Sequence, residues 1–214
     1  MRLFALAILV SAGQAVAVPT LDPLFSDHAV VQRDRPIHVR GRADPGERVA
    51  VTLGTASATA TTNKGGEWTV TLPPLAAGGP YILTATGSSG GAATASNILI
   101  GDVWLCSGQS NMEWPLRRAM GGDEAIAAAN DSQLRMLTVP QRTAFGPERS
   151  LPREVRWDAA TPDTVKEFSA LCYAMARELR AAEKVPIGAI DSSWGGTRIR
   201  PWIDEASMRA LGDT

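Results

Sequence analysis

Ser110 stands where a nucleophile for acyl-transfer chemistry could lie. The run 97–106 is rich in Ile, Leu, Val and Trp, which predicts a buried strand, and it breaks at Ser107 and Gly108 into a turn of small residues. A serine just past the carboxyl end of a strand lies where open α/β sheets bind ligands, so its hydroxyl could attack and its N–H could help hold an oxyanion. The alternative is a serine that only caps a helix. The turn is not a Gly-x-Ser-x-Gly nucleophile elbow, because Met112 replaces the second glycine.

A second loop of small residues follows the predicted strand 186–191. Its sequence is Ser192-Ser193-Trp194-Gly195-Gly196-Thr197. In a parallel sheet this loop would emerge at the same carboxyl edge as the serine. Because glycine lacks Cβ, its N–H can approach a ligand closely, so Gly195 and Gly196 are both candidate oxyanion donors. A turn that needs positive φ and binds nothing is the alternative.

The base that a serine nucleophile needs is harder to find. A serine hydroxyl is a weak nucleophile until an adjacent base, usually histidine, takes its proton. The chain has two histidines, His28 and His38, and none follows Gly101. Both lie in a strand-rich region, where a structural role is the commoner one for histidine. Neither is predicted to serve Ser110.

Two blocks of the sequence support a resemblance to a known family. Residues 101–114, GDVWLCSGQSNMEW, resemble the first catalytic block of the sialate O-acetylesterases, which belong to the SGNH class of serine hydrolases. Residues 168–173, 185–188 and 192–197 resemble the second block. The resemblance implies that Ser110 is the nucleophile and that Gly195 or Gly196 donates to the oxyanion. The candidate substrate-binding residues beside these blocks are Gln109, Asn111, Glu113, Trp194 and Arg198.

The sequence also departs from this family. Relatives often carry an acidic residue before the tryptophan at position 202, whereas Arg198 and Arg200 stand there. These arginines could pair with a substrate carboxylate, or they form a solvated surface. The later blocks of the family, which supply an oxyanion-hole asparagine and the Asp and His, have no counterpart before Thr214. We therefore expect an N-terminal fragment that holds the nucleophile but no base.

Composition and the N-terminus indicate an exported protein. The 214 residues carry a formal charge of -1 and 44% hydrophobic residues, with no basic excess that would indicate nucleic-acid binding. Arg2, the apolar run 3–10 and Ala15-Val16-Ala17 predict a signal peptide over residues 1–17. No later run approaches the roughly 20 apolar residues of a membrane helix, so we expect a periplasmic or extracellular protein without membrane insertion. The oligomeric state stays open.

The two cysteines leave two interpretations open. In an exported protein Cys106 and Cys172 could form a disulfide, or both could be buried thiols. Neither has metal-ligand spacing with a histidine, so the sequence predicts no metal site, and no cofactor is predicted.

Residues 18–97 predict a β-sandwich domain. Short segments of β-branched and aromatic residues alternate with turn clusters rich in Gly and Pro. The predicted strands are 37–40, 48–53, 68–72 and 81–86. This domain could bind sugar, or it could only support the catalytic domain.

Residues 98–214 predict the first part of an α/β domain with a parallel sheet, of the flavodoxin-like type that the SGNH resemblance implies. Predicted helices at 123–129 and 161–183 separate the strands 97–106, 133–139 and 186–191. The second helix has an apolar stripe that is expected to pack on the sheet; it contains Val165, Phe168, Leu171, Cys172, Met175 and Leu179.

The function expected from these features is hydrolysis of O-acetyl esters on sialic acid or related sugars. The same chemistry on another acetylated glycan, such as acetylxylan, is the first alternative. The second is a non-catalytic exported sugar-binding protein in which the β-sandwich is the working part.

Overall fold

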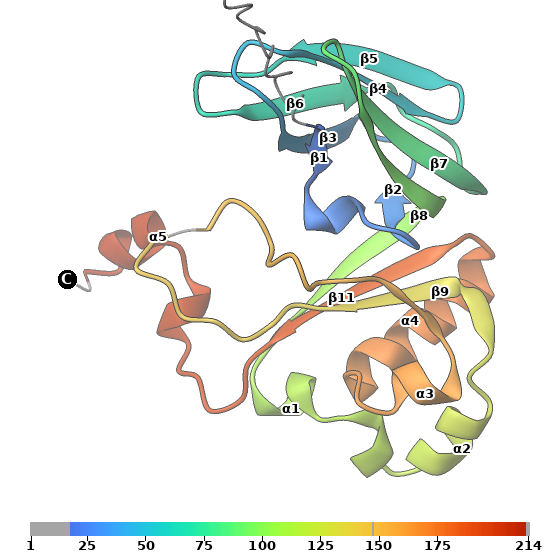
Figure 1. Ribbon diagram of the computed structural model, residues 1–214. Helices are drawn as coiled ribbons and strands as arrows, with labels where there is room; N and C mark the ends of the chain where they lie inside the picture. The colour runs from blue at the N-terminus through green and yellow to red at the C-terminus, as the bar shows by residue number, and fades with distance from the viewer. Residues whose placement is uncertain (1–17, 147, 213–214) are drawn as a thin grey trace, which may run out of the picture.

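A β-sandwich joins an α/β layer in the computed structural model, which describes residues 18–146 and 148–212 (Figure 1). The predicted signal peptide, residues 1–17, lies outside the described residues. No helix among the described residues is long and apolar enough to cross a membrane.

The sandwich contains two sheets that face each other. The smaller one is antiparallel and has the order β1 (Thr20–Leu21), β3 (Ile37–Arg42), β6 (Glu67–Leu72). The facing strands are β8 (Ala92–Gly108), β7 (Gly78–Gly87), β4 (Arg48–Leu53) and β5 (Ala56–Thr61), and β2 (Val30–Gln32) pairs in parallel with β8. A short 3-10 helix, Pro23–Phe25, precedes β2.

Alternation of apolar and polar residues explains why these segments form a sandwich. In β4 the side chains alternate strictly between exposed and buried, and Val49, Val51 and Leu53 are fully buried. They pack with Val39 and Leu72 of the opposite sheet in one core. The four strands predicted from sequence lie within β3, β4, β6 and β7, and the sheets that they form are sandwich-like; β1, β2 and β5 were not predicted.

One strand, β8, belongs to both parts of the molecule. Residues 92–100 pair antiparallel with β7, and residues 102–108 pair in parallel with β11 (Ile187–Ser193). The strand is therefore longer than the predicted run 97–106 at both ends. The domain boundary predicted between residues 97 and 98 falls inside it.

The α/β layer has the strand order β10-β9-β11-β8. Strand β9 (Asp131–Thr138) runs parallel to β11, and β10 (Asp158–Ala160) is an antiparallel edge strand. The expected parallel sheet is present, but the flavodoxin-like order is not: that order would put β8 between its two successors, whereas β11 lies between β8 and β9. The physical reason is burial, since Ile187, Gly188 and Ala189 are buried as a central strand requires.

Five α-helices and two further 3-10 helices complete the described chain. They are α1 (Ser110–Glu113), η2 (Leu116–Arg118), α2 (Gly122–Ala127), α3 (Pro162–Val165), α4 (Ala170–Glu183), η3 (Arg200–Trp202) and α5 (Glu205–Ala210). The expected cap at Thr161 is present, because its side chain accepts the N–H of Thr164 and a proline follows it.

The prediction of one helix over 161–183 is wrong, because α3 and α4 are separate. The carbonyls of Lys166 and Phe168 accept the N–H groups of Arg117 and Leu116, both at 3.0 Å, instead of continuing a helix. Ser169 then caps α4 by accepting the N–H of Cys172 at 3.2 Å.

The restarted helix also changes which side chains face the sheet. Cys172, Tyr173 and Ala176 are buried, whereas Leu171 and Met175 are 54% and 36% exposed. The expectation that these last two pack on the sheet is wrong, because each lies about 100° around the helix from a buried neighbour.

A disulfide joins the α/β sheet to its covering helix. It links Cys106 of β8 to Cys172 of α4, and the two Cα atoms lie 5.9 Å apart. Of the two interpretations that the sequence left open, the structure therefore shows the pair. Both cysteines belong to the second core, between α4 and the sheet.

Candidate active site

Ser110 is the first residue of α1 and is exposed. Strand β8 ends at Gly108, whose φ of +142° and close approach to Met112 exclude a side chain: an added Cβ would lie 2.8 Å from Met112 Cγ. Gln109 caps the helix, and its Oε1 accepts from the Ser110 N–H at 3.4 Å and from the Ser110 hydroxyl at 3.2 Å. The serine thus stands at the carboxyl edge of the sheet, as the sequence predicted.

The second glycine loop lies directly against this turn. The Trp194 N–H donates to the carbonyl of Gly108 at 2.9 Å, which extends the pairing of β8 with β11 by one step. A Cβ on Gly195 would lie 3.5 Å from the Cα of Ser110. Two segments 85 positions apart in the chain therefore meet at one edge, as expected for parallel strands.

The two candidate oxyanion donors differ in this structure. The N–H of Gly195 donates to Glu113 Oε2 at 2.6 Å. Gly196 is exposed and has a φ of +76°, a conformation that favours glycine. The Gly195 N–H is thus engaged by a carboxylate in this structure, as the Ser110 N–H is by the amide oxygen of Gln109.

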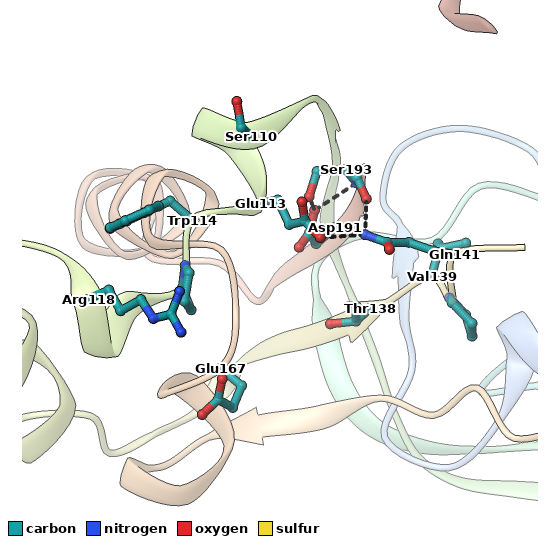
Figure 2. Close-up of a pocket in the computed structure, with 12 residues that line it drawn as sticks. Ser110, Glu113, Trp114, Arg118, Thr138, Val139, Gln141, Glu167, Asp191 and Ser193 are labelled. Atoms are coloured by element: carbon teal, nitrogen blue, oxygen red, sulfur yellow. Dashed lines mark hydrogen bonds between the residues drawn. The ribbon is translucent and has the colours of Figure 1, made fainter. Parts of the chain in front are cut away.

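A cleft of about 640 Å³ lies between α1, the end of β9 and β11. Figure 2 shows Glu113, Asp191, Ser193 and Gln141 gathered together on one side, with Trp114 and Arg118 apart from them. Trp114 is 49% exposed, and the guanidinium carbon of Arg118 lies 5.9 Å from the centre of its ring. The full lining is Ser110, Glu113, Trp114, Pro115, Arg118, Thr138, Val139, Pro140, Gln141, Glu167, Asp191 and Ser193.

Asp191 is a buried carboxyl in this lining, only 6% exposed. Its Oδ1 accepts from the N–H of Ser193 at 3.0 Å and from the Ser193 hydroxyl at 2.6 Å. Burial raises the pKa of Asp191, and repulsion from Glu113 acts in the same direction, against the lowering by the Ser193 bonds. A perturbed carboxyl in a cleft is typical of functional sites.

Sequence reasoning missed Asp191 and Gln141. Asp191 ends the predicted strand 186–191, so its position at the ligand-binding edge was a usable signal. Gln141 follows β9 in the long loop before β10, and its residue type alone carries no signal.

The remaining predicted site residues are divided between the cleft and its surroundings. Glu113 lines the cleft, whereas Gln109, Asn111, Trp194 and Arg198 are not among its lining residues. Gln109, Asn111 and Arg198 are exposed, and Trp194 is half-buried.

Both histidines lie elsewhere. His28 Nδ1 is 2.7 Å from Arg135 Nη1, and His38 Nδ1 is 3.0 Å from the hydroxyl of Thr71 in the sandwich. Neither lines the cleft. Within residues 18–146 and 148–212, no group of three or more His, Cys, Asp or Glu side chains is arranged to hold a metal ion.

The fold and the site define a class of protein: a β-sandwich joined to a parallel α/β sheet that carries an exposed serine and a glycine loop at its carboxyl edge. The chain matches no family model. It is 31% identical over 188 residues to the sialate O-acetylesterases of Pongo abelii and of Homo sapiens, which covers 80% of this chain and 36% of each relative. A crystal structure of a carbohydrate acetylesterase from Xanthomonas citri superposes with a TM-score of 0.86 and 46% identity, over 92% of this chain and 44% of that one.

The resemblance to the sialate O-acetylesterases is therefore confirmed, and this chain is a homologue of part of these enzymes. It spans about a third of the length of the curated relatives, 36% in both cases.

Proposed function

We propose that the protein is a carbohydrate O-acetylesterase of the serine type. The observation that carries this proposal is the meeting of Ser110 with the Gly195 loop at the carboxyl edge of the sheet, where a Cβ on Gly195 would lie 3.5 Å from Ser110 Cα. The similarity to sialate O-acetylesterases and to a carbohydrate acetylesterase supports the same chemistry.

In the proposed mechanism, Ser110 Oγ bonds to the acetyl carbonyl carbon while its proton passes to a base. The tetrahedral intermediate expels the sugar oxygen, which takes a proton and leaves as an alcohol. Water then attacks the acetyl-enzyme and releases acetate. The N–H groups of Ser110 and of Gly195 or Gly196 would stabilise the oxyanion, and removal of one donor of this kind costs about 3 kcal/mol in other enzymes.

The base in this mechanism rests on the resemblance. In the family it is a histidine from a block that has no counterpart within residues 1–214. Neither His28 nor His38 lines the cleft, so neither is proposed as this base.

The substrate class that we propose is an O-acetylated sugar, either sialic acid or a related glycan such as acetylxylan. The cleft volume of about 640 Å³ suits a sugar unit, and the half-exposed Trp114 ring offers an apolar face beside it. Ligand sites of this size combine such apolar faces with a few polar groups, which Arg118 and Asp191 provide here.

Acetate release by the purified full-length protein tests the proposal. The panel contains p-nitrophenyl acetate, O-acetylated sialic acids and acetylxylan. Ser110→Ala is expected to abolish release, and Ser107→Ala, an exposed serine near the end of β8, is expected to retain it. Turnover by Ser110→Ala would refute the assignment, and glycan binding without hydrolysis would favour the sugar-binding alternative.

We also propose that the protein is exported after removal of residues 1–17, on the strength of the signal-peptide pattern. Mass and N-terminal sequence of the protein recovered from its native host test this. A mature chain beginning at Val18 is expected, and an intact N-terminus in the cytoplasm would contradict it.

A further inference from the structure

The carboxylate of Glu113 connects three separate segments around Ser110. Its Oε2 accepts the N–H of Gly195 at 2.6 Å, and its Oε1 accepts from Gln141 Nε2, also at 2.6 Å. Gln141 donates in addition to the carbonyl of Ser193 at 3.3 Å. Helix α1, the loop after β9 and the loop after β11 are thus joined through one side chain. Figure 2 shows Glu113 and Gln141 pointing toward one another.

The position of Glu113 relates it directly to the serine. Glu113 and Ser110 are three residues apart on α1, so they lie on neighbouring parts of the helix surface. Hydrogen bonds from N–H groups to a carboxylate are among the stronger ones in proteins. Because such a bond holds the Gly195 peptide, and because Gly195 packs against the serine turn, a shift of this carboxylate would move the glycine loop relative to Ser110.

The glycine at position 195 is part of the same arrangement. A Cβ there would lie 2.1 Å from Glu113 Oε2, closer than any real contact. A side chain at 195 would therefore displace the Glu113 carboxylate from its present position, so the bond as observed depends on both residues. This is a property of the residue pair, and neither block of sequence reveals it alone.

We propose that Glu113 is a positioning residue: by accepting the N–H of Gly195 it fixes the Trp194-Gly195 peptide against Ser110, and so orients the glycine loop that would stabilise the oxyanion. The proposal rests on the proposed esterase function and assigns Glu113 a role other than the substrate contact expected from sequence. Both carboxylate oxygens already accept hydrogen bonds from the protein.

A set of variants in the full-length protein separates positioning from substrate contact. Glu113→Ala removes both bonds. Glu113→Gln keeps an oxygen for the Gly195 N–H but sets its NH₂ against the NH₂ of Gln141. Glu113→Gln combined with Gln141→Glu restores a donor and an acceptor between positions 113 and 141 and keeps an acceptor for the Gly195 N–H, while the bond to the Ser193 carbonyl is lost. Glu124→Ala, an exposed glutamate on α2, is the matched control.

The kinetic readout is kcat and KM for acetate release. Loss of an oxyanion donor costs about 10²- to 10³-fold in kcat elsewhere, so Glu113→Ala is expected to lose about 100-fold in kcat with KM changed less than about threefold. The double variant is expected to recover at least about tenfold over Glu113→Gln. An effect confined to KM, or no recovery in the double variant, would overturn the proposal.

Amide hydrogen exchange of the peptide that contains Gly195 gives a readout that does not depend on activity. Glu113→Ala is expected to speed exchange there about tenfold or more while the sandwich strands are unchanged. Suppose that Glu113→Ala exchanges faster at Gly195 but that the wild type releases no acetate. That result would support the contact between Glu113 and Gly195 and would refute the esterase function. Unchanged exchange would overturn the proposal whatever the kinetics show. If Glu113→Ala does not fold, the comparison of Glu113→Gln with the double variant decides the matter.

Discussion

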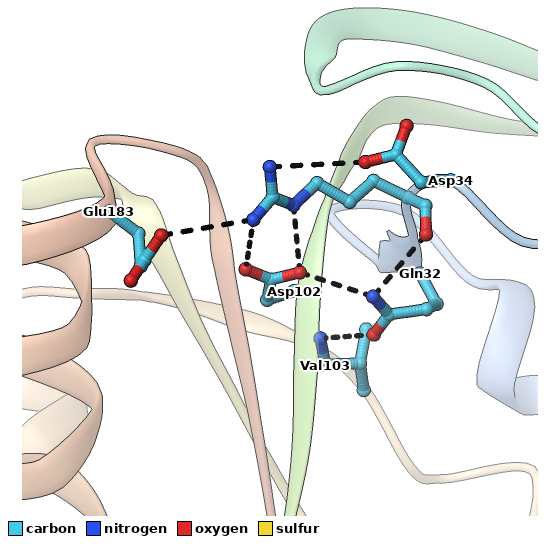
Figure 3. A network of polar contacts seen from close by, with 6 residues as sticks. Gln32, Asp34, Asp102, Val103 and Glu183 are labelled. Atoms are coloured by element: carbon cyan, nitrogen blue, oxygen red, sulfur yellow. Dashed lines mark hydrogen bonds and ion pairs between the residues drawn. The ribbon is translucent and has the colours of Figure 1, made fainter.

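The guanidinium of Arg33 forms a two-bonded fork with the carboxylate of Asp102, at 2.8 and 2.9 Å (Figure 3). Asp102 lies on β8 at the point where its neighbours change from the sandwich to β11. Beside it, Gln32 Oε1 accepts the N–H of Val103 at 2.9 Å. A side chain thus provides the hydrogen-bond acceptor for the backbone of β8 at the point where β2 ends. The fork therefore stabilises the junction of the two parts.

Asp102→Asn is expected to lower the free energy of unfolding by about 1–3 kcal/mol at pH 7, the usual range for a bond to a charged group. The Arg33 hydrogen bonds hold the pKa of Asp102 below its usual value. Because the pKa of Asp102 is lower in the folded protein than in the unfolded chain, its carboxylate contributes its full stabilisation above the unfolded-chain pKa of about 4. This stabilisation is lost as the pH falls through the lower pKa of the folded protein. Urea unfolding of both proteins between pH 7 and pH 2.5 measures this, and a difference that is constant across the range would contradict it.

Replacing both disulfide cysteines, as Cys106→Ser with Cys172→Ser, is expected to destabilise the protein strongly. The bond closes a loop with a sequence separation of 66 residues. In the chain-entropy description such a loop contributes about 4 kcal/mol. Denaturant unfolding of the double variant and of the reduced wild type, each compared with the oxidised wild type, should give similar losses, and a wild type that is insensitive to reductant would argue against the bond.

Gly101→Ala is expected to cost about 3 kcal/mol, the upper part of the range for overpacking. An added Cβ there would lie 2.0 Å from the carbonyl oxygen of Pro186, a backbone atom that cannot rotate away. Gly146→Ala is the matched control, because nothing lies within 4 Å of its Cβ. Thermal unfolding of both variants is the measurement, and equal melting temperatures would refute the close approach of the two strands.

His28→Ala is expected to destabilise the protein by about 1–3 kcal/mol, since it leaves a buried donor without a partner. Arg135 is only 4% exposed and places Nη1 2.7 Å from His28 Nδ1. A guanidinium can only donate, so the His28 ring nitrogen is the acceptor in this contact. His38→Ala, which loses an exposed contact to Thr71, should change stability by less than about 0.5 kcal/mol. Equal effects of the two substitutions would contradict a stabilising contact between His28 and Arg135.

Sequence patterns predicted the features that depend on local periodicity. The strict alternation of β4 marked it as a sandwich strand, and the break after Gly108 located Ser110 at a strand end. The meeting of the serine turn with the Gly195 loop followed from parallel strands, which end at one edge.

Features set by contacts between distant residues could not be predicted. The apolar stripe of 161–183 is periodic, and only the hydrogen bonds from Leu116 and Arg117 interrupt the helix. The engagement of Gly195 by Glu113 links residues 82 positions apart, so spacing alone could not predict this contact. Likewise, the length of β8 depends on partners that approach it from both halves of the chain.

The continuity of β8 has a mechanical consequence. Hinges between domains need a few residues whose backbone torsions are free to rotate, yet residues 92–108 are paired with a neighbour on one side or the other along almost their whole length. Bending between the two parts along this strand would break ladder hydrogen bonds. The sandwich and the α/β sheet are therefore connected by a hydrogen-bonded strand instead of a flexible linker. A change in the angle between them would have to disrupt the pairing of β8.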